Sequence, residues 1–308
     1  MNLICFTVLH YGEEDITIKC IDSIISRFNS YNIRILVLDN GSRNNSYERL
    51  CERYADKKEV SIYRSDENLG FTRGNNFLYS KAKEENPDYV LILNNDISFK
   101  QKNFLEILDK IARESNAYVI GPDVYSPRQK AHQAPLYVEI PSMDELEESM
   151  TNWQRIIDSD GADYNESKLS KRIIKSKLYE LMPETFFVCY RKIKKIMGRA
   201  EGQNLLYKKA VQNPVLQGSC IITTKQFLKN ESIVFEPDTT FYFEELLLAQ
   251  KCKQKGYQTI YDPRIQVVHN HAYASRGANG DYREYMVKQA KRMLYAYNIY
   301  REHVSKQK

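Results

Sequence analysis

Short apolar runs alternate with amphipathic segments over the first 125 residues of the chain. The apolar runs predict strands at Leu3–Leu9, Ile33–Leu38, Val60–Tyr63, Tyr89–Leu93 and Tyr118–Ile120. Between them, apolar positions recur at helical spacing and predict helices at Ile16–Phe28, Ser46–Tyr54, Thr72–Lys83 and Asn103–Ser115. This alternation, with strands that are apolar on both faces, is typical of an α/β protein whose mostly parallel sheet is covered on both sides. Ligands bind such sheets beyond the carboxyl ends of the strands.

The last third of the chain has a similar pattern. It predicts a strand at Val215–Thr223, a helix at Glu244–Lys255 that ends at Gly256, strands at Gln258–Tyr261 and Ile265–Val268, and a long helix from about Asp281 to Val304. The long helix has an apolar stripe formed by Met286, Ala290, Met293, Tyr297 and Tyr300. Core packing is the preferred interpretation of this stripe, and a homodimer interface is the alternative.

Residues 128–212 lack this alternation and contain most of the excess positive charge. From Lys168 to Lys209 there are 12 Lys or Arg residues against 3 Asp or Glu, whereas the whole chain carries a formal charge of +5. Two basic amphipathic helices are expected here, at about 171–181 and 191–199. They suit an anionic membrane surface, or they pack on the domain with a solvated basic face. Nucleic acid is not an expected partner, because basic and aromatic residues are not interleaved on a sheet face.

Composition places the chain among globular proteins of a reducing compartment. Hydrophobic residues make up 42% and charged residues 28% of the 308 positions. The six cysteines are scattered without a C-x-x-C pair, as reduced core cysteines are. The apolar run at Leu3–Leu9 has no basic flank and is too short for a signal peptide, and no stretch reaches the length of a membrane span. A cytoplasmic location is expected.

Polar residues follow two of the predicted strands directly. The run ending at Leu93 is followed by Asn94, Asn95 and Asp96. A carboxylate at a strand end is a hard oxygen ligand, suited to Mg2+ or Mn2+ on a diphosphate, although an Asx-turn gives the same pattern. Asp39-Asn40-Gly41-Ser42 follows Leu38, where Asp39 could accept from the N–H of a uracil or thymine ring.

Four further motifs carry candidate chemistry. Asn68 to Asn76 includes Gly70, Arg73 and Asn75 and opens a predicted helix, where backbone N–H groups and an arginine could bind phosphate. Gln217-Gly218-Ser219 adjoins a strand at a point where glycine allows close approach. Glu244 and Glu245 begin a helix, either as favourable partners of the helix dipole or as a general base. His269 and His271 form an H-x-H pair that could contact a metal.

Taken in order, these motifs resemble the family 2 inverting glycosyltransferases of the GT-A fold. The resemblance covers residues 1 to about 125 and 214 to 276, and it is greatest to the bacterial rhamnosyltransferase-like branch of surface and capsular polysaccharide synthesis. It implies a Rossmann-like sheet flanked by helices in one domain, residues 1–308. A nucleotide-binding half (1–125), a basic helical insert (128–212), an acceptor and catalytic half (213–276) and a C-terminal helix (281–304) would make up this domain.

The resemblance also implies roles for individual residues. Asp39 would hold the pyrimidine of a UDP- or dTDP-linked donor, and Asp96 with His269 or His271 would contact Mg2+ or Mn2+. Glu245 would be the catalytic base with Glu244 beside it, although the family's Glu-Asp pair is Glu-Glu here. The implied acceptor is a saccharide, possibly lipid-linked, at the inner membrane surface. The residues expected to line the donor and acceptor sites are Thr7, Tyr11, Asn68, Gly70, Arg73, Asn75, Asn95, Gln217, Gly218 and Ser219.

Two other functions fit parts of the same pattern. A nucleotidyltransferase shares a similar sheet and acidic metal site, but Phe6–Glu13 has no glycine-rich basic signature for a triphosphate. A non-catalytic sugar- or nucleotide-binding subunit with the same fold is the second alternative. Asn94 and Glu245 leave it open, because each differs from the residue that the family pattern has there.

Overall fold

The computed structural model describes residues 3–161, 205–270 and 282–306. Its first half alternates strands with helices: β1 (Leu3–His10), α1 (Glu14–Phe28), β2 (Asn32–Asn40), α2 (Ser46–Arg53), β3 (Val60–Ser65), α3 (Gly70–Glu84), β4 (Tyr89–Asn94), β5 (Ile97–Ser98), α4 (Phe104–Ser115), β6 (Val119–Ser126) and β7 (Ala131–His132). Each strand and helix predicted here from the hydrophobic pattern is present, with ends that differ by a few residues.

The second half adds α5 (Met143–Asp158), a 3-10 turn (Leu205–Lys208), β8 (Val211–Gln212), β9 (Cys220–Thr224), α9 (Lys225–Asn230), α10 (Glu244–Lys255), β10 (Thr259–His269) and α11 (Tyr282–Ser305). Helix α10 has the predicted bounds and ends at Gly256, which adopts φ +67° as a left-handed C-cap. The two short strands predicted after it are one strand, β10, whose register shifts between Asp262 and Gln266. The two basic helices predicted between 171 and 199 lie outside the described residues.

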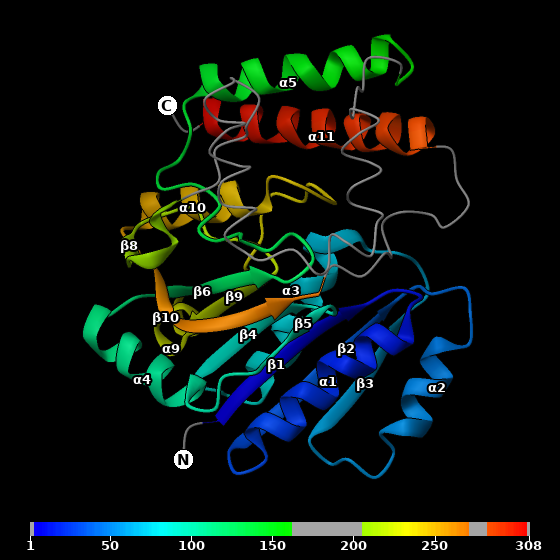
Figure 1. Ribbon diagram of the computed structural model, residues 1–308, viewed down its shortest axis with the longest axis vertical. Helices are drawn as coiled ribbons and strands as arrows, with labels where there is room; N and C mark the ends of the chain where they lie inside the picture. Colours follow the sequence, from blue (N-terminus) through cyan, green and yellow to red (C-terminus); the bar gives the residue numbers. More distant parts are fainter. Residues whose placement is uncertain (1–2, 162–204, 271–281, 307–308) are drawn as a thin grey trace.

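The strands form a mixed sheet in the order β3-β2-β1-β4-β9-β6-β10-β5, with β7 beside β6 and β8 beside β10. The prediction of parallel strands is correct for β1 to β4 and for the pair of β6 and β10. Strand β9 runs antiparallel between β4 and β6, so the two parallel groups belong to one continuous sheet (Figure 1). The amino end of β9 therefore lies next to the carboxyl end of β4.

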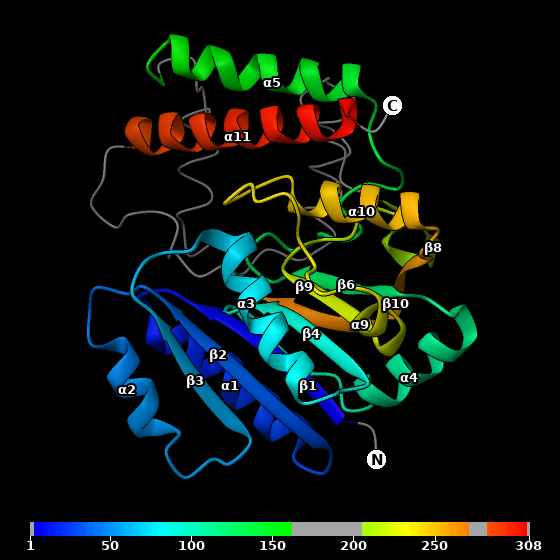
Figure 2. The ribbon, with the colours of Figure 1, turned by 180° about the vertical axis from the view of Figure 1, so that it is seen from behind.

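Helices cover both faces of this sheet (Figures 1 and 2). On one face, α1 and α4 meet through the rings of Phe28, Phe99 and Phe104, whose centroids are 5.1 to 6.2 Å apart. On the other face, Tyr79 of α3 meets Phe227 of α9 at 6.3 Å. These rings belong to one large apolar core, and aromatic pairs at such distances add to the stabilisation from burial.

A second apolar cluster joins α5, α10 and α11. Helix α11 lies alongside α5 in both views, and the two cover the side of α10 that faces away from the sheet (Figures 1 and 2). The stripe predicted for the last helix packs here: Tyr297 and Tyr300 are buried, and Phe243 lies 5.3 Å from the Tyr300 ring. The core-packing interpretation of this stripe is therefore confirmed. No helix in the parts of the chain that the structure describes has the length and apolar character to cross a membrane.

Candidate active site

Most of the predicted site residues lie along one edge of the sheet, at the carboxyl ends of β2, β1 and β4. Strand β1 aligns His10 with Asp39 of β2 and Leu9 with Asn94 of β4. Because neighbouring strands are about 4.8 Å apart, the backbones of Asp39 and Asn94 are about 10 Å from each other. The Asn94 N–H donates to the Ser219 carbonyl at 3.0 Å, so the segment before β9 joins the same edge.

Asp39 ends β2 as a fully buried carboxylate. Its Oδ1 accepts from the Ser42 N–H at 3.1 Å. Its Oδ2 has no hydrogen-bond partner among the described residues, and the nearest cation atom is Arg64 Nε at 3.7 Å. A buried carboxylate oxygen without a hydrogen bond is costly, so this atom is ready to accept from a ligand N–H.

A buried histidine that the sequence reasoning did not identify supports this edge. The His10 ring nitrogens lie 2.7 Å from Thr17 Oγ1 and 2.9 Å from Ser46 Oγ, which ties β1 to the start of α1 and α2. Burial lowers the pKa of His10, so the ring is neutral at pH 7. Asn95 Nδ2 donates to the same Thr17 hydroxyl at 3.0 Å. The nucleotide contact predicted for the Asn95 amide would require breaking that bond.

Thr7 and Tyr11 have different environments. Thr7 lies within β1, is 0% exposed, and donates to the Leu91 carbonyl at 3.4 Å. The nucleotide contact of Thr7 stays a prediction, and since its side chain packs inside the sheet, the contact would have to come from the nearby backbone. Tyr11 follows β1 and is half exposed. The next residue, Gly12, donates to Ser42 Oγ at 2.8 Å, so the loop with Tyr11 is held beside the turn after Asp39.

The loop before α3 is fixed by Asn40. Its Nδ2 donates to the Gly70 carbonyl at 3.0 Å, and its Oδ1 accepts from the Leu69 N–H at 2.9 Å. Asn68 Oδ1 accepts from the Gly70 N–H at 2.9 Å. Gly70 has φ +75°, and a Cβ there would lie 2.6 Å from Thr240 Cγ2, so glycine is required. Asn68 and Gly70 therefore shape the loop, and the backbone is what this loop offers a ligand.

Arg73 and Asn75 are less available than the sequence suggested. The Arg73 guanidinium lies 3.3 Å from Asp238 and 3.7 Å from Glu67, so a phosphate would have to replace these carboxylates. Asn75 is 1% exposed, and its Nδ2 donates to the Phe71 carbonyl within α3 at 3.0 Å. The nucleotide contact of Asn75 stays a prediction, and in this structure its side chain is buried.

Asp96 and His269 lie together although they are far apart in the sequence. His269 Nε2 is 3.2 Å from Asp96 Oδ1, and the Asn270 N–H donates to the Asp96 carbonyl at 2.9 Å. His269 Nδ1 lies 2.8 Å from Gln133 Oε1, whose own Nε2 donates to Gln129 at 3.2 Å. Since Gln133 Oε1 can only accept, Nδ1 carries the ring proton and Nε2 is directed at the carboxylate.

This arrangement matches the donor set of a divalent cation. A lone pair on Nε2 facing a carboxylate oxygen is repulsive unless a proton or a cation lies between them. Two adjacent ligands of a cation with bonds of about 2.1 Å are about 3 Å apart, close to the observed 3.2 Å. In the described residues no group of three or more His, Cys, Asp or Glu side chains could hold a metal, so Asp96 and His269 would supply only two of its ligands. His271 lies outside the described residues.

The Glu245 carboxylate lies against the backbone of Gly218. Its Oε1 accepts from the Gly218 N–H at 3.2 Å, and a Cβ on Gly218 would lie 2.4 Å from that oxygen. Gln217 Oε1 accepts from the Ser219 N–H at 2.6 Å and from the Ser219 hydroxyl. Ser219 is buried and bonded to Gln217, and its acceptor contact stays a prediction. The predicted motif also positions Glu245.

The two glutamates differ in their surroundings. Glu244 is buried and its Oε2 has no hydrogen-bond partner among the described residues. Burial raises the pKa of Glu244 well above its usual value, and the adjacent Glu245 raises it further. Burial also raises the pKa of Glu245, whereas its bonds from backbone N–H groups, including that of Gly218, lower it. Glu244 therefore keeps its proton more readily, and Glu245 is the one that ionises.

The backbone that leads into α10 is strained. Thr240, Tyr242 and Phe243 have φ values of +64°, +70° and +65°, a region that residues with a Cβ rarely adopt. Such strain persists where the surrounding structure imposes it, and it concentrates at functional sites. One of these constraints is the hydrogen bond from the Phe71 N–H to the Thr240 carbonyl at 2.7 Å.

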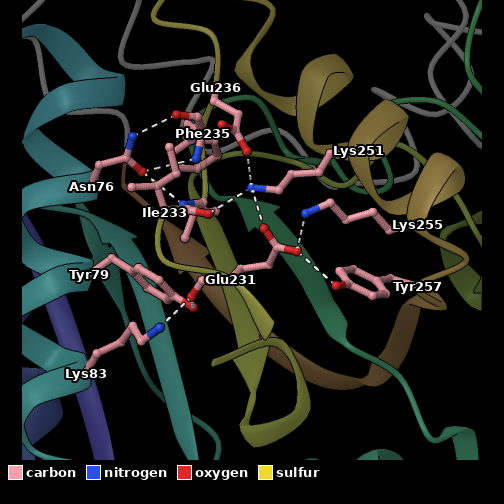
Figure 3. Close-up of polar contacts among 11 residues, drawn as sticks. Asn76, Tyr79, Lys83, Glu231, Ile233, Phe235, Glu236, Lys251, Lys255 and Tyr257 are labelled. Carbon is pink, nitrogen blue, oxygen red and sulfur yellow. Dashed lines mark hydrogen bonds and ion pairs between the residues drawn. The ribbon is translucent and has the colours of Figure 1, made fainter. Parts of the chain in front are cut away.

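An ionic cluster anchors α10 from below (Figure 3). Buried Glu231 binds Lys251 at 3.0 Å and Lys255 at 2.6 Å, and it accepts from the Tyr257 hydroxyl at 2.9 Å. Lys251 also pairs with Glu236 at 2.6 Å. The loop between α9 and α10, which contains Glu236, is also held to α3, because Asn76 Oδ1 accepts from the backbone N–H groups of residues 234 and 235.

A large cavity of about 710 Å³ lies elsewhere, around the carboxyl end of α10 and the start of β10. None of the predicted site residues lines it. The chemistry discussed above is confined to the sheet edge and the amino end of α10.

The sequence matches one known protein family. The family model "Glycosyl transferase family 2" matches residues 5–179, which is more than half of the chain. The chain belongs to glycosyl transferase family 2. The family resemblance drawn from the motifs is thus confirmed, as is the GT-A type of α/β fold. The comparison with curated proteins found no significant match.

Solved structures of glycosyltransferases resemble the chain over most of its length. GalNAc-T7, solved with UDP, GalNAc and Mn2+, matches with a TM-score of 0.53 at 12% identity and covers 88% of this chain and 44% of its own. TarS residues 1–349 of S. aureus match with a TM-score of 0.49 at 12% identity, covering 88% of this chain and 60% of that one. The chain thus spans less than two thirds of the length of either structure, and the likeness to GalNAc-T7 concerns the fold.

Proposed function

We propose that this family 2 protein transfers a sugar from a UDP- or dTDP-linked donor to a saccharide hydroxyl, with inversion at the anomeric carbon. The observation that carries the proposal is the position of Glu245. Its carboxylate is held by the Gly218 N–H, on the segment that pairs with Asn94 at the edge that also bears Asp39 and Asp96. The proposed general base, the carboxylate proposed to bind the pyrimidine and the Asp96–His269 pair therefore lie near the carboxyl ends of the same strands.

Asp39 would bind the pyrimidine. Its unpartnered Oδ2 can accept from the ring N–H that uracil and thymine share, and cytosine lacks that donor. The exposed ring of Tyr11 lies on the adjoining loop, where it can cover the flat face of a base. The UDP in the GalNAc-T7 structure and the UDP-GlcNAc in another TarS structure support a nucleotide-sugar donor.

Asp96 and His269 would hold a divalent cation, for which Mn2+ suits a mixed oxygen and nitrogen donor set. When bound, the cation supplies positive charge that offsets the charge of the departing nucleoside diphosphate. Gln133 would keep His269 in the tautomer that presents Nε2.

Glu245 would act as the general base. The acceptor oxygen attacks the anomeric carbon from the face opposite the donor diphosphate, and its proton passes to Glu245. The bond from the anomeric carbon to the diphosphate oxygen breaks, and the nucleoside diphosphate leaves with the electron pair. Glu244, whose pKa burial raises well above its usual value, would keep its proton more readily than Glu245 during this step.

The acceptor and the location of the enzyme are further parts of this proposal. A lipid-linked acceptor in surface polysaccharide synthesis would place the enzyme at the inner face of the cell membrane, with the basic stretch of residues 168–209 as its contact. Flotation with vesicles that contain or lack acidic lipid tests this point. Flotation that does not depend on acidic lipid would contradict a charge-driven contact.

The test of the central proposal is Glu245→Gln. With UDP- and dTDP-linked sugars, Mn2+ and a panel of saccharide acceptors, turnover should fall by about two to four orders of magnitude while UDP affinity is retained. The matched control is Glu52→Gln, which alters an exposed glutamate of α2 and should leave turnover unchanged. Undiminished transfer by Glu245→Gln would remove the base assignment. UDP binding by the wild type without transfer to any acceptor would favour a non-catalytic subunit.

A further inference from the structure

A cavity of about 290 Å³ lies between the strained turn before α10 and the middle of α11. It is lined by Thr239, Thr240, Phe241, Lys291, Arg292 and Tyr295. Its volume is at the lower end of the range for small-molecule sites and suits one sugar-sized group. Helix α11 lies outside the segment matched by the family model, so family membership assigns no role to this cavity.

The cavity is lined by two basic side chains that have no counter-ion among the described residues. Lys291 and Arg292 make no ion pair in the part of the chain that the structure describes. From residue 285 to 301, α11 contains no Asp or Glu at all. The Arg292 guanidinium lies 4.8 Å from the centre of the Phe241 ring, which holds it over the cavity wall. Two neighbouring exposed cations, with no carboxylate paired to them among the described residues, could bind an anion at the mouth of this cavity.

A buried hydroxyl points to the same kind of ligand. Thr239 is 1% exposed, and its Oγ1 has no hydrogen-bond partner among the described residues. Buried hydroxyls normally have a partner, and because this oxygen is itself covered by protein atoms, a ligand in the cavity would reach it only after a local rearrangement. A hydroxyl, an ammonium and a guanidinium together match the several acceptor oxygens of a phosphate group.

The cavity also adjoins the proposed base. Phe241 comes three residues before Glu244 in the same turn, and Tyr242 lies between them. Burial raises the pKa of Tyr242, Tyr285 raises it further, and the nearby Arg292 guanidinium lowers it, so Arg292 lies close to this turn. An anion held by Arg292 would therefore lie next to the amino end of α10, on the acceptor side of the site.

We propose that this cavity binds a phosphate group carried by the acceptor. The inference rests on the proposed transferase function, because it assigns the ligand to the acceptor. The phosphate has two possible sources, a phosphodiester within a soluble glycan or the diphosphate of a lipid carrier. In either case it would orient the acceptor so that its hydroxyl reaches Glu245.

The experiment measures binding of glucose 1-phosphate by calorimetry with UDP and Mn2+ saturating, so that the donor site is blocked. Lys291→Ala and Arg292→Ala should each weaken binding about tenfold, since a charge-assisted hydrogen bond is lost each time. Arg292→Lys should restore part of the loss, and Thr239→Val should weaken binding several-fold. The matched control is Lys288→Ala, one turn away on α11 and outside the cavity lining, which should change binding less than twofold.

A second arm separates the two sources. Phosphatidylcholine vesicles with and without a polyprenyl phosphate are mixed with wild type and with the Lys291→Ala, Arg292→Ala double variant. If the vesicles retain the wild type only when they contain the polyprenyl phosphate, and do not retain the double variant, the acceptor is carried by a lipid. If the protein binds glucose 1-phosphate but is not retained by these vesicles, the acceptor is soluble. The proposal is overturned if the double variant binds glucose 1-phosphate as wild type does, or if Lys288→Ala weakens it equally. UDP affinity, measured separately in every variant, reports on the proposed function independently.

Discussion

Gly218→Ala tests the link between the backbone before β9 and Glu245. A Cβ at this position would lie 2.4 Å from Glu245 Oε1 and 3.0 Å from its Cδ. An ordinary contact needs about 3.4 Å, so the carboxylate must retreat by about 1 Å and lose its bond from the Gly218 N–H. Gly218 does not have a positive φ, so alanine fits its backbone, and the neighbour that must move is the end of a flexible side chain.

Gly218→Ala should therefore lower the catalytic rate without lowering stability. A displacement of about 1 Å in a catalytic group costs about 100-fold in rate, whereas the thermal midpoint should change little. The assay pairs turnover at saturating donor with thermal unfolding and UDP affinity. Gly256→Ala is the matched control: a Cβ there meets nothing within 4 Å, but its φ of +67° penalises alanine. It should lower stability by about 1 kcal/mol and leave turnover intact. Full activity of Gly218→Ala would refute the view that Glu245 acts from its observed position.

Three further predictions follow from single contacts. Asp39→Asn should weaken UDP binding about 10- to 100-fold, because the charged acceptor for the ring N–H is lost; calorimetry that shows equal affinity would exclude Asp39 from the donor site. Gln133→Leu should weaken Mn2+ binding about 10- to 100-fold, as measured by electron paramagnetic resonance without substrate, and an unchanged affinity would show that His269 does not need this partner. Glu244 has a raised pKa in the folded state, so its cost to stability is absent below the ordinary glutamate value and grows as the pH rises toward the folded value. Glu244→Gln should therefore raise the melting temperature at pH 8 and leave it nearly unchanged at pH 4, and equal shifts at both would contradict the burial argument.

The hydrophobic pattern predicted the strands and helices of the first 125 residues, because each is a local property of the chain. It missed α5, whose buried residues Leu146 and Met150 are few among charged neighbours. A readable signal was present, since Ser142 and Glu145 form a capping box at its start. The antiparallel direction of β9 had no such signal, because strand direction is set by partners far away in the sequence.

The candidate site also contains residues whose positions could be predicted from the sequence and residues whose positions could not. The positions of Asp39, Asp96 and Glu245 at the ends of elements could be predicted because each follows or begins an element whose pattern is clear. The burial of Thr7 and Asn75 could not, since a motif does not say which way a side chain points on a strand or helix. Gln133 and His10 were missed because their partners come from distant segments.

The bond between Phe71 and Thr240 joins two parts of the chain with separate tasks. One end belongs to the loop that the donor would touch, and the other belongs to the bend from which Glu244 and Glu245 emerge. If a nucleotide binds at the first loop as proposed, this bond would transmit the contact to the position of the carboxylates. We would then expect ordered binding, with the donor before the acceptor.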